Sequence, residues 1–172
     1  MTKARDLADL IGTPTLATVA TSGAYSDVTG TPTLPTDFVS AASGGTFGGN
    51  IIVDGELIAD SYNETYAAVT STSNATTVNC HNGNTFSHTL TENTTFTFSN
   101  PPASGTGYTM SIEIIQDASA SGFTVTWPAS VDWPAATAPT LTATASAKDV
   151  FVFTTRDGGT TWYGFTAGQA LA

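Results

Sequence analysis

The chain contains few side chains that could support acid–base or metal chemistry. Cys80 and His81 are adjacent, and His88 is the second histidine. Adjacent residues of a strand point to opposite faces, so Cys80 and His81 are poorly placed to act as nucleophile and base. Asn82-Gly83 predicts a turn directly after them, with His81 in an exposed loop. We therefore expect no catalytic residue and no metal site here, and Cys80 as a small, partly buried apolar residue.

Carboxylates are the most abundant ionisable groups, 14 in all. Asp54 and Glu56 are closely spaced, a pair that could suggest glycoside hydrolysis. That reaction requires two acids that face one cleft across a sugar. These two flank a tight turn instead, where solvated carboxylates are the ordinary case. The Gly-Gly pairs lack the Lys-Ser or Lys-Thr of a phosphate loop. We expect that the protein is not an enzyme and needs no cofactor.

Two Trp-Pro pairs, Trp127-Pro128 and Trp133-Pro134, are the third candidate site. A residue before proline is held extended. In one interpretation Trp127 and Trp133 lie on a surface loop and stack on a sugar ring, as a ligand contact. The interpretation that we favour is that both rings close one end of an apolar core. We expect Trp162 in the core as well.

The three Trp residues lie in the stretch Thr85–Phe165, in which apolar and polar residues alternate as they do in short β-strands. Phe96 and Phe98 point one way in T-T-F-T-F-S, with Thr and Ser between them. Strands with one apolar face need a second layer to cover it. We therefore predict an all-β fold, with an antiparallel β-sandwich (jelly-roll-like) head over residues 76–172. The other expected core face is formed by Tyr108, Met110, Ile112 and Ile114.

Three motifs in this region resemble a module at the C-terminal end of many bacteriophage fibre proteins. They are T-E-N-T-T-F-T-F-S-N-P-P-A-S-G-T-G (Thr91–Gly107), F-T-V-T-W-P-A-S-V-D-W-P (Phe123–Pro134) and D-V-F-V-F-T-T-R-D-G-G-T-T-W-Y-G-F (Asp149–Phe165). The resemblance implies a virion protein of the fibre or decoration type. Since virion proteins of several kinds carry such modules, the resemblance implies a location in the virion but does not identify a ligand.

Composition excludes several other classes of partner. Only 10% of the 172 residues are charged, and the net charge is −10. Lys3, Arg5, Lys148 and Arg156 are the only basic residues, so the clustered cations that nucleic-acid binding requires are absent from the sequence. No segment is long and apolar enough to span a membrane, and the start of the chain does not read as a signal peptide. We expect synthesis in a host cytoplasm and localisation in the virion.

The N-terminal residues 1–12 are the one helix candidate. Leu7, Leu10 and Ile11 share one helical face. A single short helix is marginal in water, so its apolar stripe requires a partner. We expect an anchor that binds other virion proteins, because K-A-R-D-L-A-D-L-I-G resembles segments of phage fibre proteins. A frayed terminus is the alternative.

Residues 13–75 are rich in Gly, Pro, Ser and Thr and predict an extended linker or stalk. Within it, N-I-I-V-D-G-E-L-I-A at residues 50–59 predicts a β-hairpin with a type I′ turn at Asp54-Gly55. In fibres similar units form stalks in which three chains share a core. A hairpin laid on the head is the alternative. The expected oligomer contacts are Ile51, Ile52, Val53, Leu57 and Ile58.

Together these features predict a bacteriophage virion structural protein. It would be a short homotrimeric fibre or decoration protein, attached by its N-terminus, with the β head exposed outward. The alternative is a receptor-binding tail fibre adhesin that recognises a host surface glycan or protein. A small secreted lectin-like domain is a third interpretation.

Overall fold

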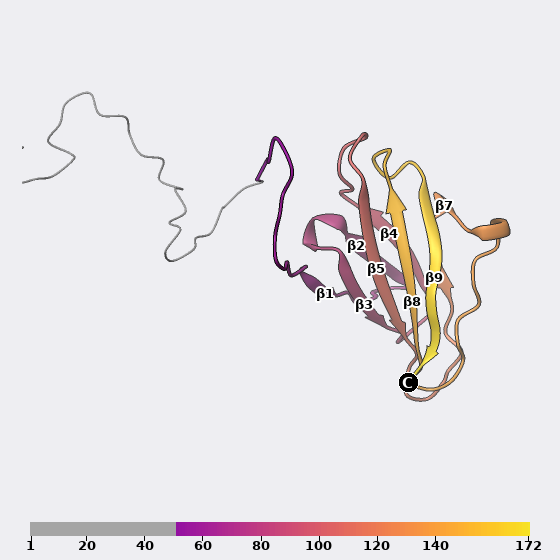
Figure 1. The fold of residues 1–172 in the computed structure, drawn as a ribbon. Helices are drawn as coiled ribbons and strands as arrows, with labels where there is room; N and C mark the ends of the chain where they lie inside the picture. Colours follow the sequence, from indigo (N-terminus) through magenta and orange to yellow (C-terminus); the bar gives the residue numbers. More distant parts are fainter. Residues whose placement is uncertain (1–50) are drawn as a thin grey trace, which may run out of the picture. The chain divides into compact units, whose positions relative to one another are not determined.

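The computed structural model describes residues 51–172, and every structural statement below concerns them. The expected anchor residues Leu7, Leu10 and Ile11, like the rest of 1–50, lie outside the described residues. Ala59–Ala172 form one compact unit. The described chain is β-rich, without an α-helix between residues 51 and 172 (Figure 1).

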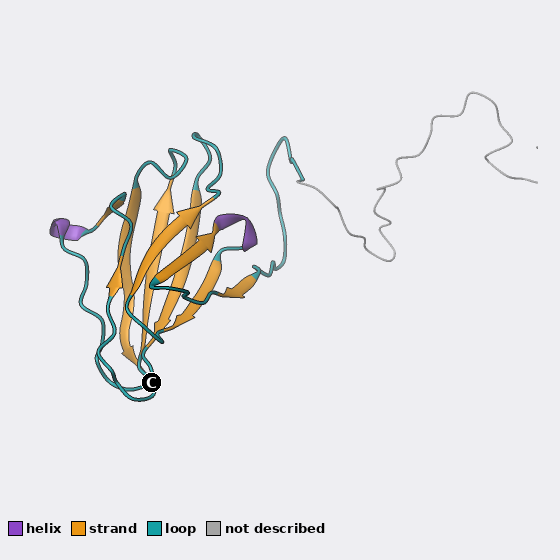
Figure 2. Ribbon diagram, turned by 180° about the vertical axis from the view of Figure 1, so that it is seen from behind, coloured by secondary structure: helices purple, strands orange, loops and turns teal. Residues whose placement is uncertain are grey.

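The strands form two sheets (Figures 1 and 2). One has six strands in the order β1-β3-β5-β8-β9-β7, and the other has three in the order β2-β4-β6. The bounds are β1 Tyr66–Ala68, β2 Ala75–Asn79, β3 Thr85–Thr89, β4 Thr94–Ser99, β5 Tyr108–Ile115, β6 Val125–Thr126, β7 Val131–Asp132, β8 Lys148–Thr155 and β9 Trp162–Leu171, with 3-10 turns at Cys80–Asn82 and Pro134–Ala136.

The antiparallel pairing that we predicted is wrong for most of the strands. Only β5–β8 and β8–β9 are antiparallel, whereas the other five pairings are parallel. The reason is that β1 to β7 alternate between the two sheets along the chain. The chain reverses its direction each time it crosses from one sheet to the other. Two strands that are two apart in chain order therefore lie in the same sheet and run in the same direction.

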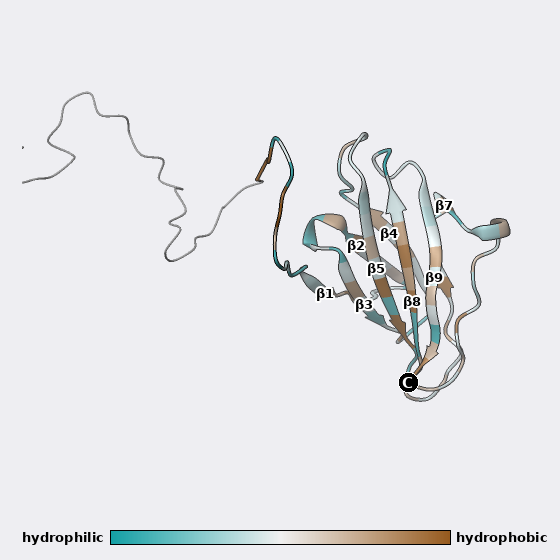
Figure 3. Cartoon of the chain, viewed as in Figure 1, coloured by the Kyte–Doolittle hydropathy of each residue, from teal (hydrophilic) through white to brown (hydrophobic). Residues whose placement is uncertain are grey.

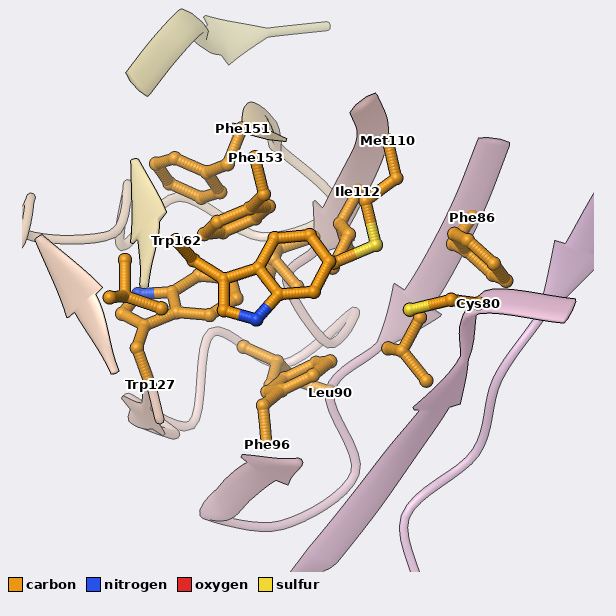
Figure 4. Packing of buried hydrophobic residues seen from close by; sticks show 13 residues of the cluster. Cys80, Phe86, Leu90, Phe96, Met110, Ile112, Trp127, Phe151, Phe153 and Trp162 are labelled. Carbon is orange, nitrogen blue, oxygen red and sulfur yellow. The ribbon is translucent and has the colours of Figure 1, made fainter. Parts of the chain in front are cut away.

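Strands of both sheets contribute residues to the core, which follows the predicted alternation. In β5, Met110, Ile112 and Ile114 are buried, and in β8 Phe151 and Phe153 are buried. Phe98 of the three-stranded sheet packs on Phe153 and Trp162 of the six-stranded sheet, with ring centroids 5.1 Å apart in each pair. Figure 4 shows the buried rings of Phe96, Trp127, Phe151, Phe153 and Trp162 close together. The buried face expected for β5 is confirmed.

The predicted hairpin at residues 50–59 is not formed. No strand occurs in residues 51–65. A type I′ turn needs positive φ at both central residues, but of Asp54 and Gly55 only Gly55 has a positive φ, at 156°. A two-stranded hairpin is at best marginally stable in water, so the turn residues alone do not hold this segment in a hairpin. Figure 3 shows apolar stretches within the segment before β1.

The sheet extends upstream of residue 76, where we expected the head to begin. β1 pairs with β3, and the Tyr66 hydroxyl and the Ser87 Oγ lie 2.6 Å apart. The Val69 N–H donates to the Ser87 carbonyl at 2.8 Å. Tyr66–Ala68, which lies within the predicted extended linker or stalk, therefore forms an edge strand of the six-stranded sheet.

Candidate functional site

Cys80 and His81 point to different environments, as expected. Cys80 is 6% exposed and lies in the core, whereas His81 is exposed in the 3-10 turn. Burial raises the pKa of the Cys80 thiol, despite a lowering contribution from the Tyr108 side chain. A thiol with a raised pKa is a poor nucleophile at neutral pH.

His88 is buried and structural in its contacts. Its Nδ1 donates to the Val69 carbonyl at 2.9 Å, and its ring packs edge-on against Phe96. Nε2 has no hydrogen-bond partner among the described residues. His88 in β3 therefore contacts both the residue that follows β1 and Phe96 of the three-stranded sheet.

Trp127 and Trp133 pack against each other and against the core. Trp127 is 9% exposed and lies 5.0 Å, centroid to centroid, from both Phe96 and Phe153. Trp133 is half-buried and lies 5.6 Å from Phe153. Gly164 leaves room for it, since a Cβ there would meet the Trp133 ring at 2.9 Å. Both rings are core contacts, and Trp127 does not offer a face to a surface ligand.

The closely spaced carboxylates Asp54 and Glu56 are exposed and lie in the strand-free segment before β1. Among residues 51–172, no group of three or more His, Cys, Asp or Glu side chains is arranged to hold a metal ion. Within the same range, no helix has the length and apolarity to cross a membrane.

Residues 51–58 carry an exposed apolar run, which we call the apolar strip. Its most exposed side chains are Ile52 at 91% and Ile58 at 85%. The large apolar residues of the strip are Ile51, Ile52, Val53, Leu57 and Ile58.

A separate pocket of about 300 Å³ lies in the compact unit, where loops meet at the end of β5. We call it the Gln116 pocket. One wall is the loop that leads into β6, and the other is the loop that precedes β8. The lining residues are Gln116, Gly122, Phe123, Thr124, Val125, Pro139, Thr140, Leu141 and Ala143.

The β6 wall is held by two polar side chains. Asp117 accepts hydrogen bonds from the backbone N–H groups of Ser119 and Ser121, at 3.0 and 2.8 Å. Asn93 Oδ1 accepts from the Thr124 N–H at 2.8 Å. Hydrogen bonding from Ser121, partly opposed by desolvation, lowers the pKa of the Asp117 carboxyl, which therefore stays ionised near neutral pH. This loop is fixed on both sides of Phe123.

The β8 wall is held by Asp149, which is 3% exposed. Its carboxylate accepts from the Thr142 N–H and hydroxyl, both at 2.7 Å, and from the Ala170 N–H at 3.0 Å. The Gln169 Nε2 also donates to the Thr140 carbonyl at 2.7 Å. Asp149 thus ties this loop to the end of β9, which is marked C in Figure 1.

Gln116, one of the lining residues, carries a buried polar atom without a partner in this part of the chain. Gln116 is 4% exposed, and its Oε1 is buried with no hydrogen-bond partner among the described residues. Its backbone N–H is satisfied by the Ala147 carbonyl at 2.9 Å. Buried polar groups nearly always have a partner, so this one needs an explanation.

Sequence reasoning missed this pocket. Its walls come from segments whose lining residues are ordinary Thr, Pro and Leu, without a recognisable motif. The one available signal was that Gln116 lies two residues after Ile114, where the inward-facing series of β5 would continue. A polar residue in an apolar series marks a site for closer inspection.

The described chain is thus a β-rich domain with a braced, uncharged pocket, preceded by an exposed apolar strip. Comparison of the chain with family models, with curated proteins and with solved structures finds no match.

Proposed function

We propose that the protein is a structural component of a bacteriophage particle, a short fibre or decoration protein. In this proposal three chains associate through the apolar strip, the N-terminus attaches to other virion proteins, and the two-sheet unit is a β-sandwich head that faces outward. The motifs that resemble phage fibre modules suggest the virion. The exposure of the apolar strip is the observation that carries the association.

Large aliphatic side chains are unfavourable in water. Full burial of one Leu, Ile or Val contributes roughly 1.5–3 kcal/mol relative to exposure. Ile52, Leu57 and Ile58 are each at least 74% exposed. The compact unit has its own core, so this strip is not needed to complete it. Association of several copies would cover the strip without altering the head.

The test is the mass of the full-length protein in solution. Light scattering on the purified chain should give three times the monomer mass. Ile52→Asp combined with Leu57→Asp should lower the mass toward one chain, because a charge in an apolar contact is strongly unfavourable. The far-UV β signature of the head should remain.

The matched control places the same two charges outside the strip, as Ser61→Asp with Thr70→Asp, both at exposed positions. This control should keep the trimer mass. A monomeric wild-type protein would overturn the fibre proposal and favour an isolated binding domain, such as a secreted lectin-like protein.

The second candidate function is that of a receptor-binding adhesin on a tail fibre. The Gln116 pocket is the specific observation that favours it, because a braced concave site on the head suits recognition of a host surface molecule. The two candidates are compatible, since a trimer can present three such sites.

A further inference from the structure

We propose that the outer face of the six-stranded sheet is a contact between the heads of neighbouring chains. The outer face consists of the side chains that alternate with the buried ones along β1, β3, β5, β8 and β9. The proposal rests on the trimeric association proposed above, and it adds a second contact to the apolar strip. All residues of this face lie within the compact unit Ala59–Ala172.

One row of residues crosses the outer face from β1 to β9. The register pairs Tyr66 with Thr85, Thr85 with Ser111, Ser111 with Val152, and Val152 with Phe165. The five strands are neighbours in the sheet (Figure 1). The row begins and ends with an exposed ring, since Tyr66 is 61% and Phe165 is 49% exposed. A sheet face in water usually carries polar side chains, so this row favours a face that another surface covers.

The β9 side of the face, defined by Arg156, Tyr163 and Phe165, is aromatic and carries a positive charge. The Arg156 guanidinium carbon lies 6.0 Å from the centroid of the Tyr163 ring. Asp132 of β7 is in register with Tyr163, but Arg156 is exposed, so it can also meet a carboxylate of another chain. Tyr, Phe and Arg are the residue types enriched where proteins meet.

The β1 side of the face, defined by Tyr62, Glu64 and Tyr66, is aromatic and carries a negative charge. The Glu64 carboxylate accepts a hydrogen bond from the Thr85 hydroxyl at 3.2 Å, which holds it beside the start of β3. A pocket of about 340 Å³ lies between Tyr62, Glu64 and the strands β5 and β8. The two sides therefore match, because one offers exposed rings and a cation, and the other offers a hollow and a carboxylate.

This match identifies the occupant as a second copy of the chain. A closed ring of three chains is built from heterologous contacts, in which two different surfaces of each chain meet. Rotation about an axis along the strands leaves every residue at the same height. Because Tyr66 and Phe165 lie in one row, the β1 side of one chain meets the β9 side of the next at the same height. A foreign partner would not require the two sides to complement each other.

The apolar strip makes a small contact of this kind sufficient. Ile58 and Tyr62 are four residues apart, a stretch that spans at most about 14 Å when fully extended. Chains that are joined through the strip therefore hold their heads close together. A tether of this length gives the heads a high effective concentration, so their contact can be weak by itself.

Cysteine cross-linking of the full-length protein tests the proposal with Tyr66→Cys combined with Phe165→Cys, treated with a bismaleimide that has a two-carbon spacer. Within one head the two positions are separated by four strand spacings, about 19 Å, which is too far for this linker. We expect a covalent trimer on a denaturing gel. The matched control, Tyr66→Cys with Thr95→Cys, moves the second cysteine to an exposed position of the three-stranded sheet and should give no covalent trimer.

The outcomes separate this contact from the strip. A wild-type protein of trimeric mass without the covalent trimer would overturn the contact and leave the fibre proposal intact. When Ile52→Asp and Leu57→Asp are added to the cysteine pair, the covalent trimer should disappear, because the tether is lost. A covalent trimer that persists would support the head contact and show that the strip is not required.

Phe165→Asp is a second variant that needs no cross-linking. It places a charge in the proposed contact at an exposed position, so the fold should remain. The protein concentration at which half of the trimer dissociates should rise about tenfold or more, as for loss of an aromatic anchor. Thr95→Asp, the matched control on the other sheet, should leave that concentration unchanged. Equal concentrations for the two variants would overturn the proposal.

Discussion

Phe96 and Phe98 have the same sequence environment, and yet the structure places them differently. Phe96 is 1% exposed and contacts both His88 and Trp127. Phe98 is half-buried at the margin of the core. The alternation of polar and apolar residues does not distinguish the two positions, but their burial does.

Phe96→Ala should therefore lower the free energy of unfolding by roughly 3–5 kcal/mol, as large-to-small core changes do. Phe98→Ala should cost less, because part of its ring is already in water. Urea unfolding monitored by fluorescence measures both. A melting temperature of the Phe96→Ala protein close to that of the wild type would show that this ring is not part of the core.

Asp149 predicts a dependence of stability on pH. Burial alone would raise the pKa of its carboxyl group, but the hydrogen bonds from Thr142, Ala170 and Gln169 outweigh it and lower the pKa below its ordinary value. A carboxylate with a lower pKa in the folded state stabilises the fold above its unfolded pKa. That contribution is lost as the pH falls through the folded pKa.

The wild-type free energy of unfolding should thus fall below about pH 4, the ordinary range of an aspartate. Asp149→Asn should be less stable at pH 7 and should show a shallower fall, so the gap between the two proteins narrows in acid. Asp60→Asn, at an exposed position, is the control. Parallel pH profiles for wild type and Asp149→Asn, measured by urea unfolding, would refute this role.

At the scale of elements, the alternation of β1 to β7 between sheets makes the short strands depend on one another. β1 has only three residues, but it covers the edge of β3 and supplies the segment whose Val69 carbonyl pairs with His88. Truncation before or after β1 should consequently have different effects.

A fragment of residues 59–172 should fold with a melting temperature near that of the full-length head. A fragment of residues 76–172 should melt at a lower temperature, because it leaves His88 Nδ1 without its acceptor and removes the β3 edge partner. Circular dichroism melts of the two fragments measure this. Equal melting temperatures would show that the head begins at residue 76 and that β1 adds nothing.

At the scale of the molecule, two surfaces of different character lie apart along the chain. The apolar strip at residues 51–58 is unfavourable in water, whereas the compact unit has a core of its own that buries Phe96, Phe151, Phe153 and Trp162. The net charge of −10 opposes non-specific association between copies, so any association must come from a localised contact. The proposed trimer uses such a contact.

Much of the fold was determined by the sequence alone, because strand period is a local property. Side chains two residues apart share a face whatever the strand pairs with, so the buried face of Met110, Ile112 and Ile114 could be predicted. The separation of buried Cys80 from exposed His81 and the core position of Trp162 follow from equally local patterns.

Only the tertiary structure decided the pairing of the strands and the position of the pocket. Whether β3 pairs with β4 or with β5 depends on which sheet each crossing reaches, and short-range patterns carry no information on that. The hairpin at Asp54-Gly55 was a reasonable local prediction, but the turn residues could not form a ladder without support. The Gln116 pocket is lined by residues between 116 and 143 that lie apart in the sequence, and only the tertiary structure brings them together.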